Sequence, residues 1–221
     1  MNRLALFDCD GTLVDSAATI VGAVSETFSL HRLDIPEPQR CRRVIGLSLV
    51  EAMAELAPAG DHAALAETYK NCFIRARAEG RVEEPLFEGI LRLLDALEGD
   101  GWLLGVATGK SDRGLKHCLD LHGIHARFVS LQTADRHPSK PHPSMALQAI
   151  ADAGAAPATT IVIGDTAFDM AMARAAGAVG IGAAWGYHEP HELLAAGAAS
   201  VAERPSDVLA LATRVKGTQD A

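Results

Sequence analysis

Two aspartates stand one residue apart directly after a short apolar segment. Residues 4–7 read Leu-Ala-Leu-Phe, and Asp8 and Asp10 follow before a Gly-Thr turn. Because alternate residues of a strand share a face, both carboxylates are expected to project to the same side. Two like charges at that spacing repel each other unless a cation or a shared proton compensates. The pair therefore indicates a chemical site rather than a solvated strand end.

Reactive side chains follow three more apolar segments of the chain. Thr108 ends one segment, Asp165 follows a second with Asp169 four residues further on, and Lys140 lies in a loop after a third. In open parallel sheets, ligands bind beyond the carboxyl ends of the strands. If these segments are parallel strands, their reactive ends meet at one edge of the sheet.

This set of residues suits metal-assisted phosphoryl chemistry. Carboxylates without Cys or His among them make a hard, oxygen-rich site of the kind that Mg²⁺ prefers. Thr108 supplies a hydroxyl donor and Lys140 a fixed cation, both of which suit a phosphoryl group. One carboxylate can attack phosphorus, and a second can protonate the leaving oxygen and later deprotonate water.

The elements that must position these residues alternate between strand and helix after residue 85. We expect strands at 3–8, 102–108, 128–131, 160–163 and 179–183, and helices at 89–97, 111–122, 144–153, 168–176, 190–195 and 206–213. The strands read as continuous apolar runs, which is typical of strands covered on both faces. The alternation predicts an α/β fold with a doubly wound parallel sheet.

Between residues 16 and 81 the pattern is helical, with no convincing strand. Helices are expected at 17–30, 39–45, 49–57 and 62–79, with Ser16 and Asp61 as N-caps. Since the first strand buries nothing alone, it must join the later sheet. We therefore predict a core domain of residues 1–15 and 82–221, interrupted by a helical domain of residues 16–81.

Composition narrows the class of partner. The 221 residues carry a net charge of −8 and are 48% hydrophobic, so a sizeable core is expected but no basic stripe for nucleic acid or anionic membranes. Four scattered cysteines indicate neither a disulfide framework nor a zinc site. With no signal-peptide pattern and no apolar run of membrane-spanning length, we expect a cytoplasmic protein that is a monomer or homodimer.

Four ordered motifs resemble the haloacid dehalogenase (HAD) superfamily over essentially the full chain. They are Asp8-x-Asp10-Gly-Thr-Leu, Thr108-Gly109-Lys110, Lys140-Pro, and Gly-Asp165-x-x-x-Asp169. The helical insertion after the first motif is similar to the four-helix cap of the subclass that contains phosphoglycolate phosphatase and β-phosphoglucomutase. The resemblance implies a Rossmann-like core, an inserted helical cap and Mg²⁺ as cofactor.

The resemblance also implies roles for the acidic residues. Asp8 is expected to be the nucleophile and a Mg²⁺ ligand. Asp10 is expected to be the general acid/base and to bind Mg²⁺ through its backbone carbonyl. Asp165 is expected to be a metal ligand, supported by Asp169 directly or through water.

The remaining motif residues are expected to hold the phosphoryl group. By the same resemblance, Thr108 and the backbone N–H of Gly109 bind the phosphoryl oxygens, and Lys140 neutralises their charge. The acidic residue at Asp10 favours phosphate esters over dehalogenation, because an alkoxide leaving group needs a proton and a halide does not.

Substrate selection is expected to depend on the helical insertion. Arg43, near the end of the second expected helix, and Gly46, in the turn after it, are our candidates for contact with the substrate, although exposed arginines often only solvate a helix face.

The predicted function is hydrolysis of a small phosphorylated metabolite, a phosphoglycolate-like phosphomonoester, through an aspartyl-phosphate. A β-phosphoglucomutase-like phosphomutase or a pyrophosphatase of the same family are the alternatives that use the same motifs. A receiver-type signalling domain shares the acidic pair, but it lacks a helical insertion and needs an acceptor Asp on its third strand, for which Asp135 is a poor substitute.

Overall fold

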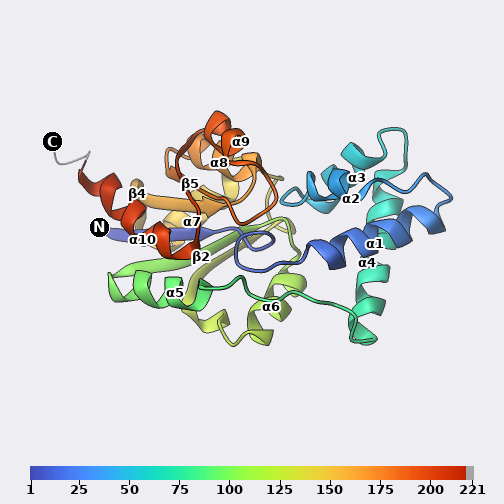
Figure 1. The fold of residues 1–221 in the computed structure, drawn as a ribbon, viewed down its shortest axis with the longest axis horizontal. Coiled ribbons are helices and arrows are strands. Elements are labelled where there is room, and N and C mark those ends of the chain that lie inside the picture. Colours follow the sequence, from blue (N-terminus) through green and yellow to red (C-terminus); the bar gives the residue numbers. More distant parts are fainter. Residues whose placement is uncertain (218–221) are drawn as a thin grey trace.

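Within residues 1–217, which the structure describes, six strands form one parallel sheet with helices on both faces (Figure 1). The structure is a computed structural model. The strands are β1 (Asn2–Phe7), β2 (Trp102–Thr108), β3 (Phe128–Thr133), β4 (Ala155–Gly164), β5 (Val179–Ala183) and β6 (Ala198–Ala202). Their order is β3-β2-β1-β4-β5-β6, so the winding reverses between β1 and β4. Open α/β sheets bind ligands at that position, and the predicted α/β class is confirmed.

The central strand β1 is apolar because both of its faces are covered. Leu4 and Leu6 pack into the hydrophobic cluster on one face of the sheet, while Ala5 and Phe7 pack into the cluster on the other. All four side chains are completely buried. Full burial of a Leu or Phe side chain contributes about 1.5–3 kcal/mol, so β1 is anchored from both sides.

Helices cover both faces of the sheet. The Phe7 face is covered by α5 (Ile90–Gly99), α6 (Asp112–Leu121) and α10 (Val208–Gly217). The Leu4 face is covered by α7 (Ser144–Asp152) and α8 (Ala167–Ala175), and α9 (Pro190–Ala196) packs beside α8. Short 3₁₀ turns precede β3 (His125–Arg127) and α10 (Pro205–Asp207).

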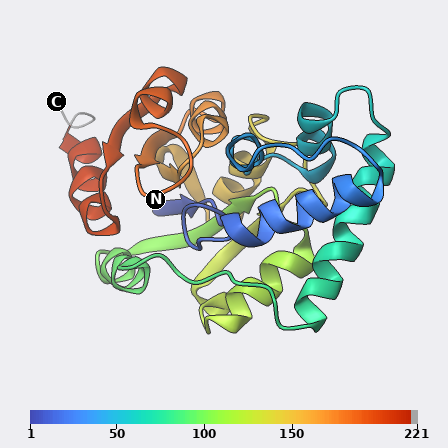
Figure 2. The same cartoon turned by 45° about the vertical axis from the view of Figure 1, so that its right-hand side comes forward.

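Four further helices form a separate group at the end of the sheet where β1 terminates (Figures 1 and 2). They are α1 (Ala17–Leu30), α2 (Pro38–Arg42), α3 (Leu49–Leu56) and α4 (His62–Ala78). They enclose their own apolar cluster, which includes Val24, Phe28 and Met53. We call residues 16–81 the helical insert. Across residues 1–217, no helix is long and apolar enough to cross a membrane.

The two linkers of the insert are hydrogen-bonded to each other. Asp15 N donates to the carbonyl of Pro85 at 2.9 Å, and Phe87 N donates to the carbonyl of Leu13 at 3.0 Å. Val14 and Leu86 form an antiparallel bridge between them. The insert is therefore connected to the sheet by two linkers that are hydrogen-bonded to each other rather than by two independent linkers.

Several element boundaries differ from the sequence prediction. The pattern does not predict β6, whose Ala-rich segment contains one β-branched residue, and it misses the start of β4, where Ala155 pairs with Asn2. The second helix of the insert ends at Arg42 rather than at residue 45, because the N–H groups of Val44 and Ile45 bond three residues back in turns.

The predicted helix caps have different outcomes. Asp61 caps α4 as predicted, by accepting from Ala64 N at 3.0 Å. Ser16 occupies the N-cap position of α1 as predicted, but its side chain makes no capping bond and instead donates to Asp10.

Candidate active site

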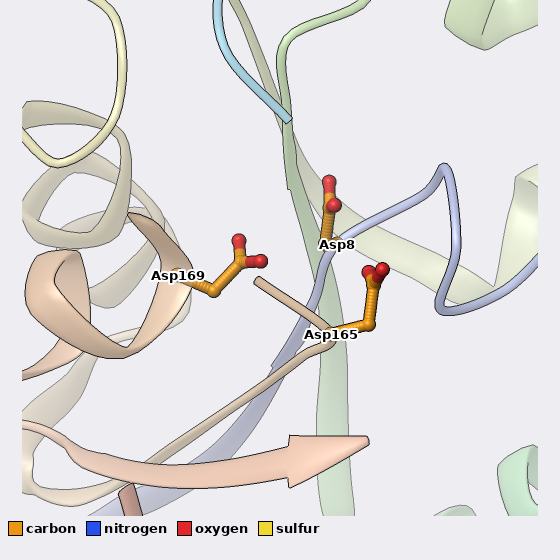
Figure 3. A group of neighbouring side chains, drawn as sticks. All are labelled: Asp8, Asp165 and Asp169. Carbon is orange, nitrogen blue, oxygen red and sulfur yellow. The ribbon is translucent and has the colours of Figure 1, made fainter. Parts of the chain in front are cut away.

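Three carboxylates converge where the winding of the sheet reverses (Figure 3). Asp8 directly follows β1, Asp165 directly follows β4, and Asp169 lies in the first turn of α8. Each offers one oxygen, and the three oxygens lie within 4.8 Å of one another. All three residues are buried. We call Asp8, Asp165 and Asp169 the carboxylate cluster.

Lys140 supplies a positive charge to this cluster. Its ammonium nitrogen lies 2.8 Å from Asp8 Oδ1 and 2.6 Å from Asp169 Oδ1, and its side chain is completely buried. Burial by itself would lower the pKa of Lys140, but the carboxylates of Asp169 and Asp8 outweigh that effect and raise it. Lys140 is therefore a permanent cation at neutral pH.

One lysine does not compensate three buried carboxylates. Burial raises the pKa of Asp8 to about 7; Lys140 opposes this shift, and the charge of Asp169 adds to it. Burial, followed by the charges of Asp8 and Asp169, raises the pKa of Asp165. Apart from the ion pair between Oδ1 and Lys140, neither oxygen of Asp8 accepts a hydrogen bond within the described part of the chain. The cluster thus has room for a further cation, and Asp8 has free lone pairs.

Asp165 is held by two donors from different loops. Thr12 Oγ1 donates to Oδ1 at 2.8 Å, and the backbone N–H of Tyr187 donates to Oδ2 at 2.9 Å. Gly11 has a φ of +84°, and a Cβ there would lie 2.2 Å from Asp165 Oδ2. The glycine after Asp10 therefore leaves the space that this carboxylate occupies.

Asp169 differs from the other two carboxylates because both of its oxygens are occupied. Oδ1 accepts from Lys140, and Oδ2 accepts from the N–H and the hydroxyl of Thr166 in a capping box at the start of α8. Its lone pairs are largely used, so Asp169 is suited to orient Lys140 and to support a ligand rather than to be the principal one.

The donor set of the cluster fits Mg²⁺. It consists of carboxylate oxygens alone, and Mg²⁺ prefers such hard ligands together with water or substrate oxygens. In residues 1–217 it is the one group of acidic, His or Cys side chains with this geometry. Asp8 and Asp165 both retain lone pairs that can face a metal ion.

Asp10 lies outside the cluster and is held by other residues. Its Oδ1 accepts from the Ser16 hydroxyl and lies 2.8 Å from the ammonium group of Lys110. Lys110 also lies 2.6 Å from Glu84 Oε1. Thr108 is completely buried, and its hydroxyl accepts from Lys110 N at 3.2 Å. The predicted motif residues Asp10 and Thr108 thus lie at the same edge of the sheet as the cluster.

The turn after α2 contacts this edge of the sheet. A Cβ at Gly109 would lie 2.2 Å from the carbonyl oxygen of Leu47, so the two backbones touch. Gly46 lies against Thr166, and Ser48 N donates to Ser139 Oγ at 2.8 Å. The insert therefore covers Gly109, and the predicted candidate Gly46 lies where insert and core meet.

Arg43 makes its contacts with the core. Its two terminal nitrogens each lie 2.6 Å from an oxygen of Glu192 in α9, and its carbonyl oxygen accepts from His188 Nε2 at 3.3 Å. The side chain is 44% exposed. In this structure Arg43 joins the insert to the core and does not project toward the cluster carboxylates.

Sequence reasoning missed several residues that hold the site. Thr12 and Lys110 lie inside predicted motifs, and their spacing alone could have suggested a role. Glu84 carried no signal, because a glutamate beside a proline in a linker is normally exposed, yet it is buried here. Asp135 accepts from Asp112 N at 2.8 Å, in the loop after β3.

Comparisons with known proteins agree with this geometry. The family model described as "Haloacid dehalogenase-like hydrolase" matches residues 5–183. A probable phosphatase, IndB, of Dickeya dadantii is 34% identical over 96% of this chain and 94% of its own length. A phosphoglycolate phosphatase of Xylella fastidiosa is 33% identical over 86% of this chain and 83% of its own.

Solved structures show the same fold. A haloacid dehalogenase-like hydrolase from Streptococcus pneumoniae superposes with a TM-score of 0.83 at 29% identity, covering 95% of this chain and 98% of that one. The resemblance predicted from the four motifs is confirmed by the family match and by the relatives. This chain therefore belongs to the haloacid dehalogenase-like hydrolases, and it is a phosphatase of that family.

Proposed function

We propose that the protein is a Mg²⁺-dependent phosphatase that hydrolyses a small phosphomonoester through an aspartyl-phosphate. The observation that carries this proposal is the environment of Asp8. Its carboxylate is buried, pairs with Lys140 through Oδ1, accepts no other hydrogen bond within residues 1–217, and lies beside two further carboxylates. Such a group is free to attack, provided that cations offset the repulsion between it and an anionic phosphate.

The reaction has two steps. An oxygen of Asp8 attacks phosphorus, and the bond from phosphorus to the leaving alcohol oxygen breaks as Asp10 gives that oxygen its proton. Asp10 then takes a proton from water as the water oxygen attacks the aspartyl-phosphate and breaks its bond to Asp8. Inorganic phosphate leaves, Asp8 is a carboxylate again, and Asp10 carries the proton for the next turnover.

Other residues hold the phosphoryl group during both steps. The Thr108 hydroxyl and the Gly109 N–H are proposed donors to its oxygens, and Lys140 neutralises the charge shared with Asp8. Mg²⁺ would be held by Asp8, Asp165 and the backbone carbonyl of Asp10, with Asp169 in support. When bound, the metal ion supplies Lewis-acid stabilisation of charge on the phosphoryl oxygens.

We propose that the helical insert is a cap domain, with residues 1–15 and 82–221 as the core domain. The contact of the Leu47 carbonyl with Gly109 supports this division, because it places the insert against a residue proposed to bind the phosphoryl group. The relatives named phosphoglycolate phosphatase support a small, phosphoglycolate-like ester as the substrate. Within the cap we propose that Gly46 and Arg43 influence substrate choice. A monomeric or dimeric cytoplasmic protein stays a prediction.

The test is hydrolysis of 4-nitrophenyl phosphate with Mg²⁺, with EDTA, and by Asp8→Asn. We expect activity with Mg²⁺, and its loss in EDTA and in the variant. Asp34→Asn, which changes an exposed aspartate of the insert, is the matched control and should retain activity. Equal rates in Mg²⁺ and EDTA, or an active Asp8→Asn, would contradict the mechanism.

A second assay identifies the substrate and the reaction type. Phosphoglycolate, sugar phosphates and pyrophosphate are compared by release of inorganic phosphate. Preferred hydrolysis of phosphoglycolate or a similar ester supports the proposal. Transfer of the phosphoryl group between sugar isomers without net phosphate release would instead identify a phosphomutase.

A further inference from the structure

Lys110 has no part in the mechanism above, yet it is one of the most constrained cations in the molecule. Its side chain is 10% exposed, and its ammonium nitrogen lies 2.8 Å from Asp10 Oδ1 and 2.6 Å from Glu84 Oε1. An exposed lysine would lose side-chain entropy in such a geometry for little gain. The burial of Lys110 and its two close carboxylate partners therefore need an explanation.

Glu84 is the more unusual member of this pair. It lies in the second linker of the insert, and its side chain is fully buried. Oε1 faces Lys110, while Oε2 accepts no hydrogen bond from the described residues and is 3.8 Å from the nearest nitrogen of Arg77. Its carbonyl oxygen accepts from His122 Nε2 at 2.7 Å.

A buried ion pair of this kind is weak evidence for stability. Taking two charges out of water costs several kcal/mol, and an apolar pair of similar volume is often as stable or more so. The placement of Glu84 is better explained by what its partner Lys110 does to a third group, Asp10.

The two oxygens of Asp10 are in different situations. Oδ1 accepts from the Ser16 hydroxyl and pairs with Lys110. Oδ2 takes no hydrogen bond from any residue that the structure describes, although Asp10 is almost fully buried. One oxygen is therefore fixed from two sides, and the other has no partner among those residues.

We propose that Lys110, held in place by Glu84, is a positioning residue that fixes Asp10 through Oδ1 and leaves Oδ2 for proton transfer. This inference rests on the proposed function, in which Asp10 protonates the leaving oxygen. Lys110 and Glu84 touch no reacting atom in this role. Their contribution is the orientation of the acid, on which transfer to a leaving alkoxide depends.

The role predicts a dependence on the leaving group. An alkyl phosphate releases a strongly basic alkoxide that needs a proton, whereas 4-nitrophenyl phosphate releases a stable phenolate. Because kcat/KM reports the steps up to the first cleavage, a misplaced acid lowers it for the alkyl ester far more than for the aryl ester. General acid catalysis contributes about 10²–10⁴-fold, so partial misplacement should be readily measured.

The experiment compares wild-type protein, Glu84→Gln and Lys110→Met with both substrates in saturating Mg²⁺. The alkyl substrate is the best one found in the phosphate-release panel. We expect Lys110→Met to lower kcat/KM for the alkyl ester at least 10-fold more than for 4-nitrophenyl phosphate, and Glu84→Gln to shift the ratio the same way by a smaller factor. Glu83→Gln changes the exposed neighbour in the same linker and should leave the ratio unchanged.

Folding and function are separated by the remaining variants. Lys110→Met leaves the buried Glu84 without a partner and can therefore unfold the protein. If Lys110→Met does not fold, the comparison of the two esters rests on Glu84→Gln, which keeps the size and polarity of the side chain. Lys110→Arg keeps the charge and should restore part of the ratio. Equal losses on the two esters in folded Glu84→Gln would overturn this inference. An active Asp8→Asn would instead overturn the proposed function, and the two failures are thereby distinguishable.

Discussion

The carboxylate cluster and the contact between insert and core are built in opposite ways. The cluster and Lys140 are buried; Asp8 and Asp165 directly follow strands of the sheet, Asp169 lies in the first turn of α8, and Lys140 lies in the loop before α7. The insert contact is made by residues 43–48 against the core, and its ion pair joins side chains of Arg43 and Glu192 that are 44% and 25% exposed. One region is held by packing on all sides, and the other by a few partly solvated bonds.

This difference fits the proposed roles of the two regions, in which the cluster carries out the chemistry and the insert controls access to it. A site that holds like charges together needs rigid surroundings, because every displacement changes the electrostatic balance. A lid must open within each turnover, so the contacts that hold it closed have to be weak compared with those of the core. Four predictions follow for these two regions, in order of decreasing effect.

The largest effect is expected for Lys140→Met. Removing this cation leaves buried carboxylates without compensation, which costs about 3–5 kcal/mol. The free energy of unfolding in EDTA should fall by that amount in urea titrations, and Mg²⁺ should recover part of it. Activity should fall at least on the order of 10²-fold, the size expected for loss of one charge-stabilising donor. A variant as stable as the wild type in EDTA would show that the cluster is solvated in solution.

Gly109→Ala should have the next largest effect. Its new Cβ would lie 2.2 Å from the Leu47 carbonyl oxygen, so the turn of the insert must move away. A displacement of this size near the chemistry can cost about 10²-fold in kcat/KM, while the core remains folded. Gly22→Ala in α1 meets no atom within 4 Å and is the matched control. Unchanged kcat/KM in Gly109→Ala would mean that the turn is not docked on the core during catalysis.

A smaller effect is expected at Arg43 and Glu192. The pair is bidentate but partly exposed, so a double-mutant cycle of Arg43→Met and Glu192→Gln should give a coupling of about 0.2–1 kcal/mol. The loss of kcat/KM in Arg43→Met should be below about 10-fold and larger for a natural ester than for 4-nitrophenyl phosphate. A coupling energy that matches the Lys140 effect would remove the distinction between the two regions.

The smallest effect concerns His188, which contacts both regions. Its Nδ1 accepts from Ala167 N at 3.2 Å, and its Nε2 donates to the carbonyl of Arg43. Burial, helped by the charge of Arg43, lowers the pKa of His188 in the folded protein. Its contribution to stability is therefore complete above the ordinary value near 6.5 and is lost as the pH falls toward the folded pKa. His188→Gln should flatten the fall in unfolding temperature between pH 7.5 and 5. Identical pH profiles would exclude this role.

The features that can be predicted from this sequence are those encoded by short local patterns of residues. The position of Asp8 and Asp165 directly after strands is predictable, because an apolar run followed by acid is a local signal and parallel topology brings strand ends together. The partner of Arg43 was not predictable, since Glu192 lies far along the chain on a helix with no distinguishing motif. Burial of Glu84 likewise depends on how the insert packs against the core, and the spacing of residues in the sequence does not predict that packing.

The position of β1 in the sheet has a consequence for biosynthesis. β1 is translated first, but its two neighbours β2 and β4 follow about 100 and 150 residues later. At a translation rate of ~5–20 residues per second, roughly 8–30 s pass between the synthesis of Asp8 and that of Asp165. Until residues 102–108 have been made, the apolar β1 segment has neither neighbour, and Asp8 has no counter-charge before Lys140 is made. A ribosome-bound fragment that ends before residue 165 lacks one carboxylate of the cluster, and we expect it to be inactive.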